Sequence, residues 1–207
     1  NDRCFGDLYD RIKAGEFLAV FAAPPCSTFS IARFIKPRDG STGAPVVRDR
    51  NNIHGLEKPP AGHERELLRA NRVVDRTVAL LHAAATAGSE FIMENPADRG
   101  NPLVPHLYSE ARHGPIWLLP GVQALARKHM ARSCTFPLCE LGGDFQKYTT
   151  LMYTSGLESA LGPLDRLRCS HPAGAHQAAG GMHNDEGFWV SRDAAAYPPD
   201  FNCFIAE

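Results

Sequence analysis

The chain has 207 residues, of which 43% are hydrophobic and 22% are charged, which is enough apolar material for one ordinary core. It contains no apolar run of about eighteen residues or more, so no membrane span is expected. The net charge of -1 excludes a global attraction to nucleic acid, and any such binding must come from a local basic patch. The six scattered cysteines do not form a small secreted disulfide framework, so we expect reduced thiols inside a cell.

The first predicted element is a short buried strand over residues 16–23, which ends at two prolines followed by Cys26. The end of a strand is where α/β proteins place their chemistry. Residues 34–62 then form a long basic loop rich in proline and glycine. Because so long a loop is rarely an idle connection in a compact domain, we interpret it as a mobile lid over a site.

A helix is predicted over residues 63–87, where apolar residues recur at helical spacing before Gly88 ends the pattern. The arginines between them fit either a solvated face or contacts with phosphate. A second apolar strand over residues 91–93 runs directly into Glu94. Strand, helical crossover and strand form the layout of a βαβ unit, so we predict that these two strands are parallel.

The second half of the chain continues with a predicted helix over residues 122–130. Two strands over residues 131–138 and 149–154 follow, joined by a turn at Gly142 and Gly143. Beyond these strands the sequence is rich in loops. We therefore predict one domain over residues 1–207, with an α/β core over 1–154 and a loop-rich C-terminal part over 155–207.

Cys26 and Glu94 occupy corresponding places after the two predicted parallel strands. A lone cysteine is often only a small buried hydrophobe, but two prolines stiffen the backbone before Cys26 and favour an outward, reactive thiol. Glu94 has either a capping or ion-pairing role, or serves as a buried carboxyl group suited to hold a proton. Neighbouring strand ends would let the two groups grip a flat substrate from its two sides.

These residues carry a resemblance to a known family. The segment Ala-Pro-Pro-Cys-Ser-Thr-Phe-Ser at residues 23–30 resembles the Pro-Cys nucleophile motif of DNA cytosine-5 methyltransferases, and Glu94-Asn95-Pro96 resembles their Glu-Asn motif. Phe5-Gly6-Asp7-Leu8 resembles the Gly-Asp-Ile segment, whose aspartate contacts the adenine of S-adenosyl-L-methionine. Phe145-Gln146-Lys147 resembles the glutamine-arginine motif near the target base. The motifs occur in the family's order over most of the chain.

The resemblance implies transfer of a methyl group from S-adenosyl-L-methionine to carbon five of a cytosine in DNA. The Cys26 thiolate would add to carbon six, and Glu94 would neutralise the ring nitrogen. The target base would be flipped out of the helix, and the loop after Phe34, with Lys36 and Arg38, would close over it. The residues implied for the cofactor are Asp7, Pro24 and Pro25, and those implied for the substrate are Ser30, Arg33, Asn95, Gln146 and Lys147.

The fold implied is α/β, a partial Rossmann-like methyltransferase sheet of parallel strands with crossover helices. The family's glycine-rich cofactor loop and its N-terminal strands are missing from this sequence, and Tyr148 and Thr150 stand where its arginines are expected. We therefore expect an upstream segment in a longer polypeptide and poor cofactor binding by residues 1–207 alone. The alternative is a catalytically inactive methyltransferase-like module that binds nucleic acid or a partner.

The loop-rich part also contains the residue types of a zinc site, in Cys169, His171 and His176, with Cys134 and Cys139 as further candidates. Their spacing fits no standard zinc finger, which favours solvated or loop-packing histidines. We therefore assign no metal ligand from the sequence. A zinc-stabilised binding domain is the third alternative.

Overall fold

The structure is a computed structural model that describes residues 2–37, 40, 42–100, 109–172, 174–176 and 195–206. The helices in these residues are α1 (Asp2–Lys13), α2 (Glu64–Thr86), α3 (Pro120–Lys128), α4 (Glu158–Leu161) and α5 (Pro199–Ala206). The strands are β1 (Ala19–Ala22), β2 (Glu90–Pro96), β3 (Arg132–Pro137) and β4 (Tyr148–Tyr153). Two short 3-10 helices, η1 (Ile31–Phe34) and η3 (Leu138–Leu141), border the region discussed below.

The four strands form one mixed sheet in the order β1-β2-β4-β3. The predicted βαβ unit is confirmed, because β1 and β2 are parallel and α2 connects them. The expectation of a parallel sheet holds only for this pair, since β4 runs antiparallel to both β2 and β3. The physical reason is the short connection between β3 and β4, which is too short for the crossover that a parallel pair requires. An antiparallel strand beside parallel ones is common in α/β sheets.

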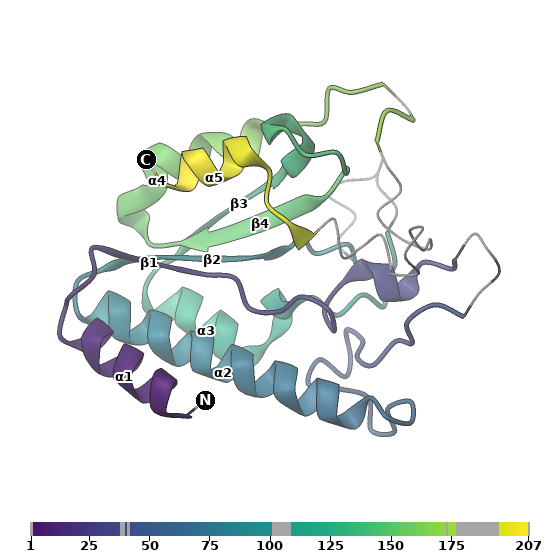
Figure 1. The fold of residues 1–207 in the computed structure, drawn as a ribbon, viewed down its shortest axis with the longest axis horizontal. Coiled ribbons are helices and arrows are strands. Elements are labelled where there is room, and N and C mark those ends of the chain that lie inside the picture. The colour runs from purple at the N-terminus through teal and green to yellow at the C-terminus, as the bar shows by residue number, and fades with distance from the viewer. Residues whose placement is uncertain are drawn as a thin grey trace.

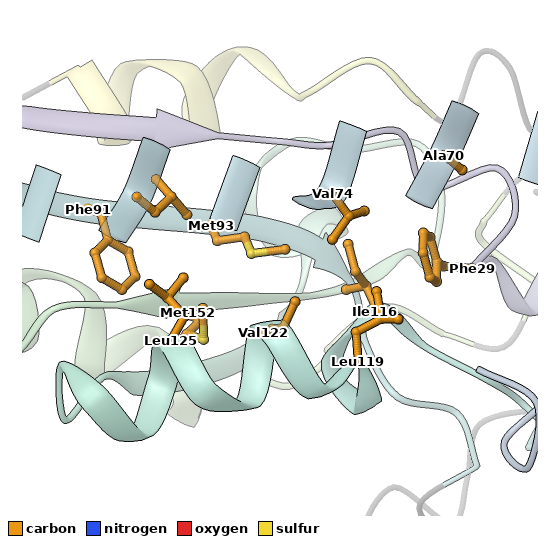
Figure 2. Packing of buried hydrophobic residues seen from close by; sticks show 11 residues of the cluster. Phe29, Ala70, Val74, Phe91, Met93, Ile116, Leu119, Val122, Leu125 and Met152 are labelled. Atoms are coloured by element: carbon orange, nitrogen blue, oxygen red, sulfur yellow. The ribbon is translucent and has the colours of Figure 1, made fainter. Parts of the chain in front are cut away.

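Helices cover both faces of this sheet (Figure 1). Helices α1, α2 and α3 lie on one face, while α4 and α5 lie on the other, over β3 and β4. The larger core lies between the sheet and the helices α2 and α3, as Figure 2 shows, and includes Phe91, Met93 and Val122. Among the described residues, no helix combines the length and the apolar character of a membrane span.

The alternation along β2 decides which face carries the candidate site. Phe91 and Met93 point into the core beneath α2, whereas Ile92 packs with Leu151 in the cluster beneath α5. Side chains of a strand alternate between its two faces. Glu94 has the same parity as Ile92, so its carboxyl group lies on the α5 face of the sheet.

Helix α1 was not expected from the sequence. Its exposed Asp2 forms ion pairs with Arg72, at 2.9 Å, and with Arg76, and the Arg76 guanidinium lies over the Phe5 ring. These two arginines of α2 therefore bind α1. From the sequence we had expected the arginines of this helix either to face solvent or to contact phosphate, and neither expectation included binding to another helix. Asp7 lies within α1 and is exposed, so it does not stand at a strand end.

The described part of the basic loop is anchored rather than free. Arg48 is only 1% exposed, and its guanidinium donates to Thr28 Oγ1 at 2.9 Å and to the Ile53 carbonyl at 2.6 Å. It also lies 3.8 Å above the centroid of the Phe29 ring. The expectation of a mobile lid is therefore wrong for the residues around Arg48, because a buried cation needs its fixed partners. Arg38 lies outside the described residues.

Candidate functional site

The carboxyl ends of β1 and β2 are tied together by a buried hydrogen bond. The side-chain amide of Asn95 donates to the Pro24 carbonyl at 2.9 Å, and both residues are buried. Two residues further on, Cys26 begins a tight turn in which its carbonyl accepts from the Phe29 backbone N–H at 2.9 Å. The hydrogen bond therefore fixes the start of the turn that carries Cys26 relative to the end of β2, where Glu94 lies.

Glu94 is buried, with 4% of its surface exposed, and two hydroxyl groups bind it. The Tyr197 hydroxyl donates to Oε2 at 2.6 Å, and the Thr149 hydroxyl donates to Oε1. Thr149 comes from β4 and Tyr197 from the segment before α5. Each carboxyl oxygen thus has a hydrogen-bond partner, as a buried polar group requires.

Cys26 is half-buried, and it lies within electrostatic reach of Glu94 and Lys147. Burial raises the pKa of the Cys26 thiol, the Lys147 cation opposes this rise, and the Glu94 carboxylate adds to it. The pKa of Tyr197 is also raised, first by burial and then by Glu94, with a further contribution from Cys26. These four side chains therefore form one electrostatic cluster at the ends of β1 and β2.

A small pocket lies beside this cluster. Lys147 and Tyr197 form part of its wall, and the Lys147 ammonium lies 5.6 Å from the centroid of the Tyr197 ring. The pocket has a volume of about 180 Å³. Because drug-sized ligands occupy roughly 300–1,000 Å³, this space suits no more than a single ring or a few polar groups.

Two residues predicted to bind the substrate are engaged with the protein. The Ser30 hydroxyl accepts from the Ala32 backbone N–H at 3.1 Å and caps η1. The Arg33 guanidinium donates to the carbonyls of Ser27 and Pro45, each at 2.7 Å, and pairs with Glu66 at 2.5 Å. Both residues hold the segment after Cys26 in place, and their contact with a substrate stays a prediction.

The remaining predicted residues are divided between the cluster and the surface. The structure brings Pro24, Asn95 and Lys147 to the strand ends, beside Cys26 and Glu94. Pro25 is exposed, and so is Gln146, whose side chain lies against the Cys169 thiol. Asp7 is exposed on α1, which lies away from the carboxyl ends of β1 and β2 (Figure 1).

Sequence reasoning missed Thr149 and Tyr197 as partners of Glu94. The alternation in β4 contained a signal for Thr149, which shares a face with the buried Leu151 and Tyr153. No local sequence pattern could have predicted that Tyr197 binds Glu94, because the two residues lie 103 positions apart in the chain.

Comparison of the chain with models of known protein families found no match, and comparisons with curated proteins and with solved structures found no significant similarity. The family resemblance thus depends on the short motifs and on the way in which their residues are arranged.

Proposed function

We propose that the chain is the catalytic part of a DNA cytosine-5 methyltransferase-like domain, with Cys26 as nucleophile and Glu94 as the partner of the substrate ring. The observation that carries the proposal is the position of Cys26 and Glu94 at the carboxyl ends of a parallel strand pair, where the Glu94 carboxylate is near enough to raise the pKa of the Cys26 thiol. The hydrogen bond from Asn95 to Pro24 supports it, since it fixes the two motifs against each other.

The chemistry begins when the partly exposed Cys26 thiol loses its proton to solvent water. The sulfur then forms a bond to carbon six of cytosine, while the π electrons of the carbon five–carbon six bond move through the ring towards the ring nitrogen. A proton or hydrogen bond at Glu94 neutralises the charge that develops there. Carbon five becomes nucleophilic as a result. A base inside a duplex cannot reach Cys26, so the cytosine must leave the stack first.

Glu94 is ready for this role only after a rearrangement. The Tyr197 hydroxyl is bound to Oε2, one of the two oxygens that a ring nitrogen could use. The other oxygen faces the buried Thr149 hydroxyl. The incoming base would therefore displace Tyr197, whose short segment before α5 lies on the wall of the pocket.

The residues expected to hold S-adenosyl-L-methionine lie on separate elements, Asp7 in α1 and Pro24 and Pro25 after β1. Asp7 faces solvent on α1, Pro25 is exposed, and the edge of β1 away from β2 has no strand beside it in these residues. Methyl transfer from S-adenosyl-L-methionine is the part of the proposal that the resemblance alone supports.

The second candidate is a catalytically inactive methyltransferase-like module that binds nucleic acid or a partner. The observation that favours it is the full occupation of Glu94 by two hydroxyl donors. In that case the cluster would be a structural link between β2, β4 and the segment before α5.

Exchange of the cytosine carbon-five hydrogen with solvent tests the nucleophile separately from the cofactor. Addition of a thiol at carbon six activates carbon five even when no methyl donor is present. DNA labelled with tritium at carbon five should release its label in the presence of the protein. Cys26→Ser should abolish the release, whereas Cys203→Ser, which changes an exposed cysteine of α5, should leave it unchanged.

A second arm adds S-adenosyl-L-methionine and DNA that contains 5-fluorocytosine. A covalent complex through Cys26 would support the complete methyltransferase proposal, because fluorine at carbon five blocks the final elimination. Tritium release without this complex would support the roles of Cys26 and Glu94 and would refute methyl transfer by this chain. DNA binding with neither signal would favour the inactive module.

A further inference from the structure

Four metal-ligating side chains converge at the end of the sheet next to η3. They are Cys139 of η3, together with Cys169, His171 and His176 of the segment that follows α4. Each offers one ligand atom, and these four atoms all lie within 4.8 Å of one another. Cys139 is buried, and it comes from a part of the chain far from the other three. The fold has therefore brought two thiols and two imidazoles to one point.

Two of the distances within the cluster match those between the ligands of a tetrahedral zinc ion. The Cys169 sulfur lies 3.7 Å from Nδ1 of His171 and 3.5 Å from Nε2 of His176. Zinc bonds of about 2.3 Å to sulfur and about 2.0–2.1 Å to nitrogen place those ligands about 3.6 Å apart at a tetrahedral angle. The Cys169 thiol and the two imidazoles thus already have the spacing of zinc ligands, and the remaining distances of at most 4.8 Å would shorten as the ion draws the four atoms together.

The donor types select zinc among the common divalent ions. Magnesium and calcium prefer oxygen ligands, whereas two thiolates and two imidazoles in tetrahedral geometry suit zinc. Two thiolates also balance the charge of the ion, which favours a partly buried site. Because four protein ligands leave no open position, such a site is structural rather than catalytic.

We propose that Cys139, Cys169, His171 and His176 bind one zinc ion in a closed structural site. This replaces the sequence-based interpretation of these histidines as solvated or loop-packing residues. It also chooses between Cys134 and Cys139, which the sequence offered equally as further ligands. Cys134 of β3 packs in the apolar cluster with Leu151 and so does not face the proposed ion.

The loop between Cys169 and His171 is already held in a shape that suits the ion. The Glu140 carboxylate accepts from the Ser170 backbone N–H at 2.7 Å and lies 3.2 Å from Nδ1 of His171. Nδ1 of His171 donates its N–H to this carboxylate; on metal binding the imidazole would carry its proton on Nε2 instead, so that the lone pair of Nδ1 faces zinc. Glu140 would keep its hydrogen bonds to Ser170 and so hold the loop against η3.

The zinc ion would stiffen one wall of the candidate site. The Cys169 backbone N–H lies 3.4 Å from the Tyr148 hydroxyl, and the Cys169 thiol touches Gln146. Lys147 lies between Gln146 and Tyr148 in the chain, and its charge acts on Cys26. The site would therefore join the segment after α4 to the connection that positions Lys147, whatever reaction Cys26 performs.

Metal analysis of the purified chain tests the proposal. Under reducing conditions with zinc supplied, the protein should contain about one zinc per chain after dialysis. Cys169→Ser and His176→Ala should each lower the retained zinc at least tenfold. The matched control is Cys203→Ser, which changes an exposed cysteine away from the cluster and should retain zinc as the parent does.

Cobalt provides a second readout that does not depend on how well the variants fold. Chelator-treated parent protein, titrated with Co²⁺, should develop the visible absorption of a tetrahedral thiolate complex, and added Zn²⁺ should remove it. The proposal would be overturned if the parent retained no zinc and gave no such spectrum, or if Cys169→Ser retained zinc at the parent's level. A Cys139–Cys169 disulfide found under the same reducing conditions would also overturn it.

Discussion

Cys26 lies within reach of one anion and one cation, and their effects on the thiol oppose each other. Burial is the main cause of its raised pKa, and Glu94 adds to that effect, whereas Lys147 lowers the pKa. Only the thiolate is a good nucleophile. At neutral pH, Lys147 is therefore the residue that favours the reactive form, which is a role distinct from the substrate contact that its motif implies.

This balance predicts the pH dependence of Cys26 reactivity. Lys147→Met removes the charge that lowers the pKa of Cys26, so its alkylation curve should move to higher pH. At a pH below that pKa, the rate should fall about tenfold for every unit by which the pKa rises, while Lys147→Arg should keep most of the parent's rate. Iodoacetamide labelling followed by peptide mass mapping measures this, with exposed Cys203 as internal reference. Identical curves for the Met and Arg variants would contradict the assignment.

The hydroxyl donors of Glu94 predict a stability difference between two adjacent threonines. Thr149→Val keeps the shape but leaves a buried carboxylate oxygen without its donor, which should cost about 1–3 kcal/mol. Thr150→Val removes a bond to the Thr135 hydroxyl, a neutral partner at 2.7 Å, and should cost about 0.5–1.5 kcal/mol. Urea unfolding compares the two free energies of unfolding. Equal losses would show that Glu94 does not depend on this hydroxyl.

Among the elements, the segment after β1 owes its shape to buried polar side chains. Arg48 bonds to Thr28 and Ile53 and stacks on Phe29, and Nε2–H of His113 donates to the Phe29 carbonyl at 2.8 Å. Burial lowers the pKa of Arg48 to about 10, so it remains charged at neutral pH. This network holds the chain immediately beyond Cys26.

The network predicts a large effect at Arg48 and a small one at Arg50. Arg48→Met removes several hydrogen bonds from a buried site and should lower the free energy of unfolding by about 2–4 kcal/mol. Arg50→Met removes a partly exposed ion pair with Asp98 and should cost less than about 1 kcal/mol. Denaturant unfolding gives both values. Similar small losses in the two variants would mean that the loop is not anchored through Arg48.

Across the molecule as a whole, the sheet is covered unevenly. Within the described residues, β1 pairs only with β2, so its other edge is open. Leu18, just before this strand, is 95% exposed, and Phe21 within it is 38% exposed. An open edge flanked by apolar side chains can pair with another strand, from this chain or from a second copy.

This edge predicts concentration-dependent association of the isolated chain. Leu18→Lys should weaken it, because a lysine at a strand edge opposes pairing. Leu68→Lys changes another exposed leucine, 68% exposed on α2 and away from the edge, and should leave the association unchanged. Sedimentation velocity over a range of concentrations measures the effect. A parent that stays monomeric, or equal effects of both variants, would contradict the prediction.

Local patterns in the sequence were sufficient to predict the order of the four strands with helices α2 and α3, and the parallel pairing of β1 with β2. These patterns are apolar periodicity and the prolines and glycines that end elements. They also placed Cys26 just beyond β1 and Glu94 near the end of β2, although Glu94 lies within that strand rather than after it. Helices α4 and α5 were not predicted, because the part of the chain after residue 154 was interpreted as loop-rich. The position of β4 between β2 and β3 could be predicted only in part. The turn at Gly142 and Gly143 indicated that β3 and β4 form a pair, but it did not indicate which of the two strands would lie beside β2.

The surroundings of those positions emerged only in the folded chain. The donors to Glu94, the docking of α1 on α2, the anchoring of Arg48 and the meeting of Cys139 with the Cys169 segment join residues that are far apart in the chain. No local pattern encodes these contacts, because side chains meet only after the sheet order and the helix packing have brought their elements together. For that reason the sequence could name the four residues only as candidates, and no standard spacing rule could assign them as zinc ligands or choose Cys139 over Cys134.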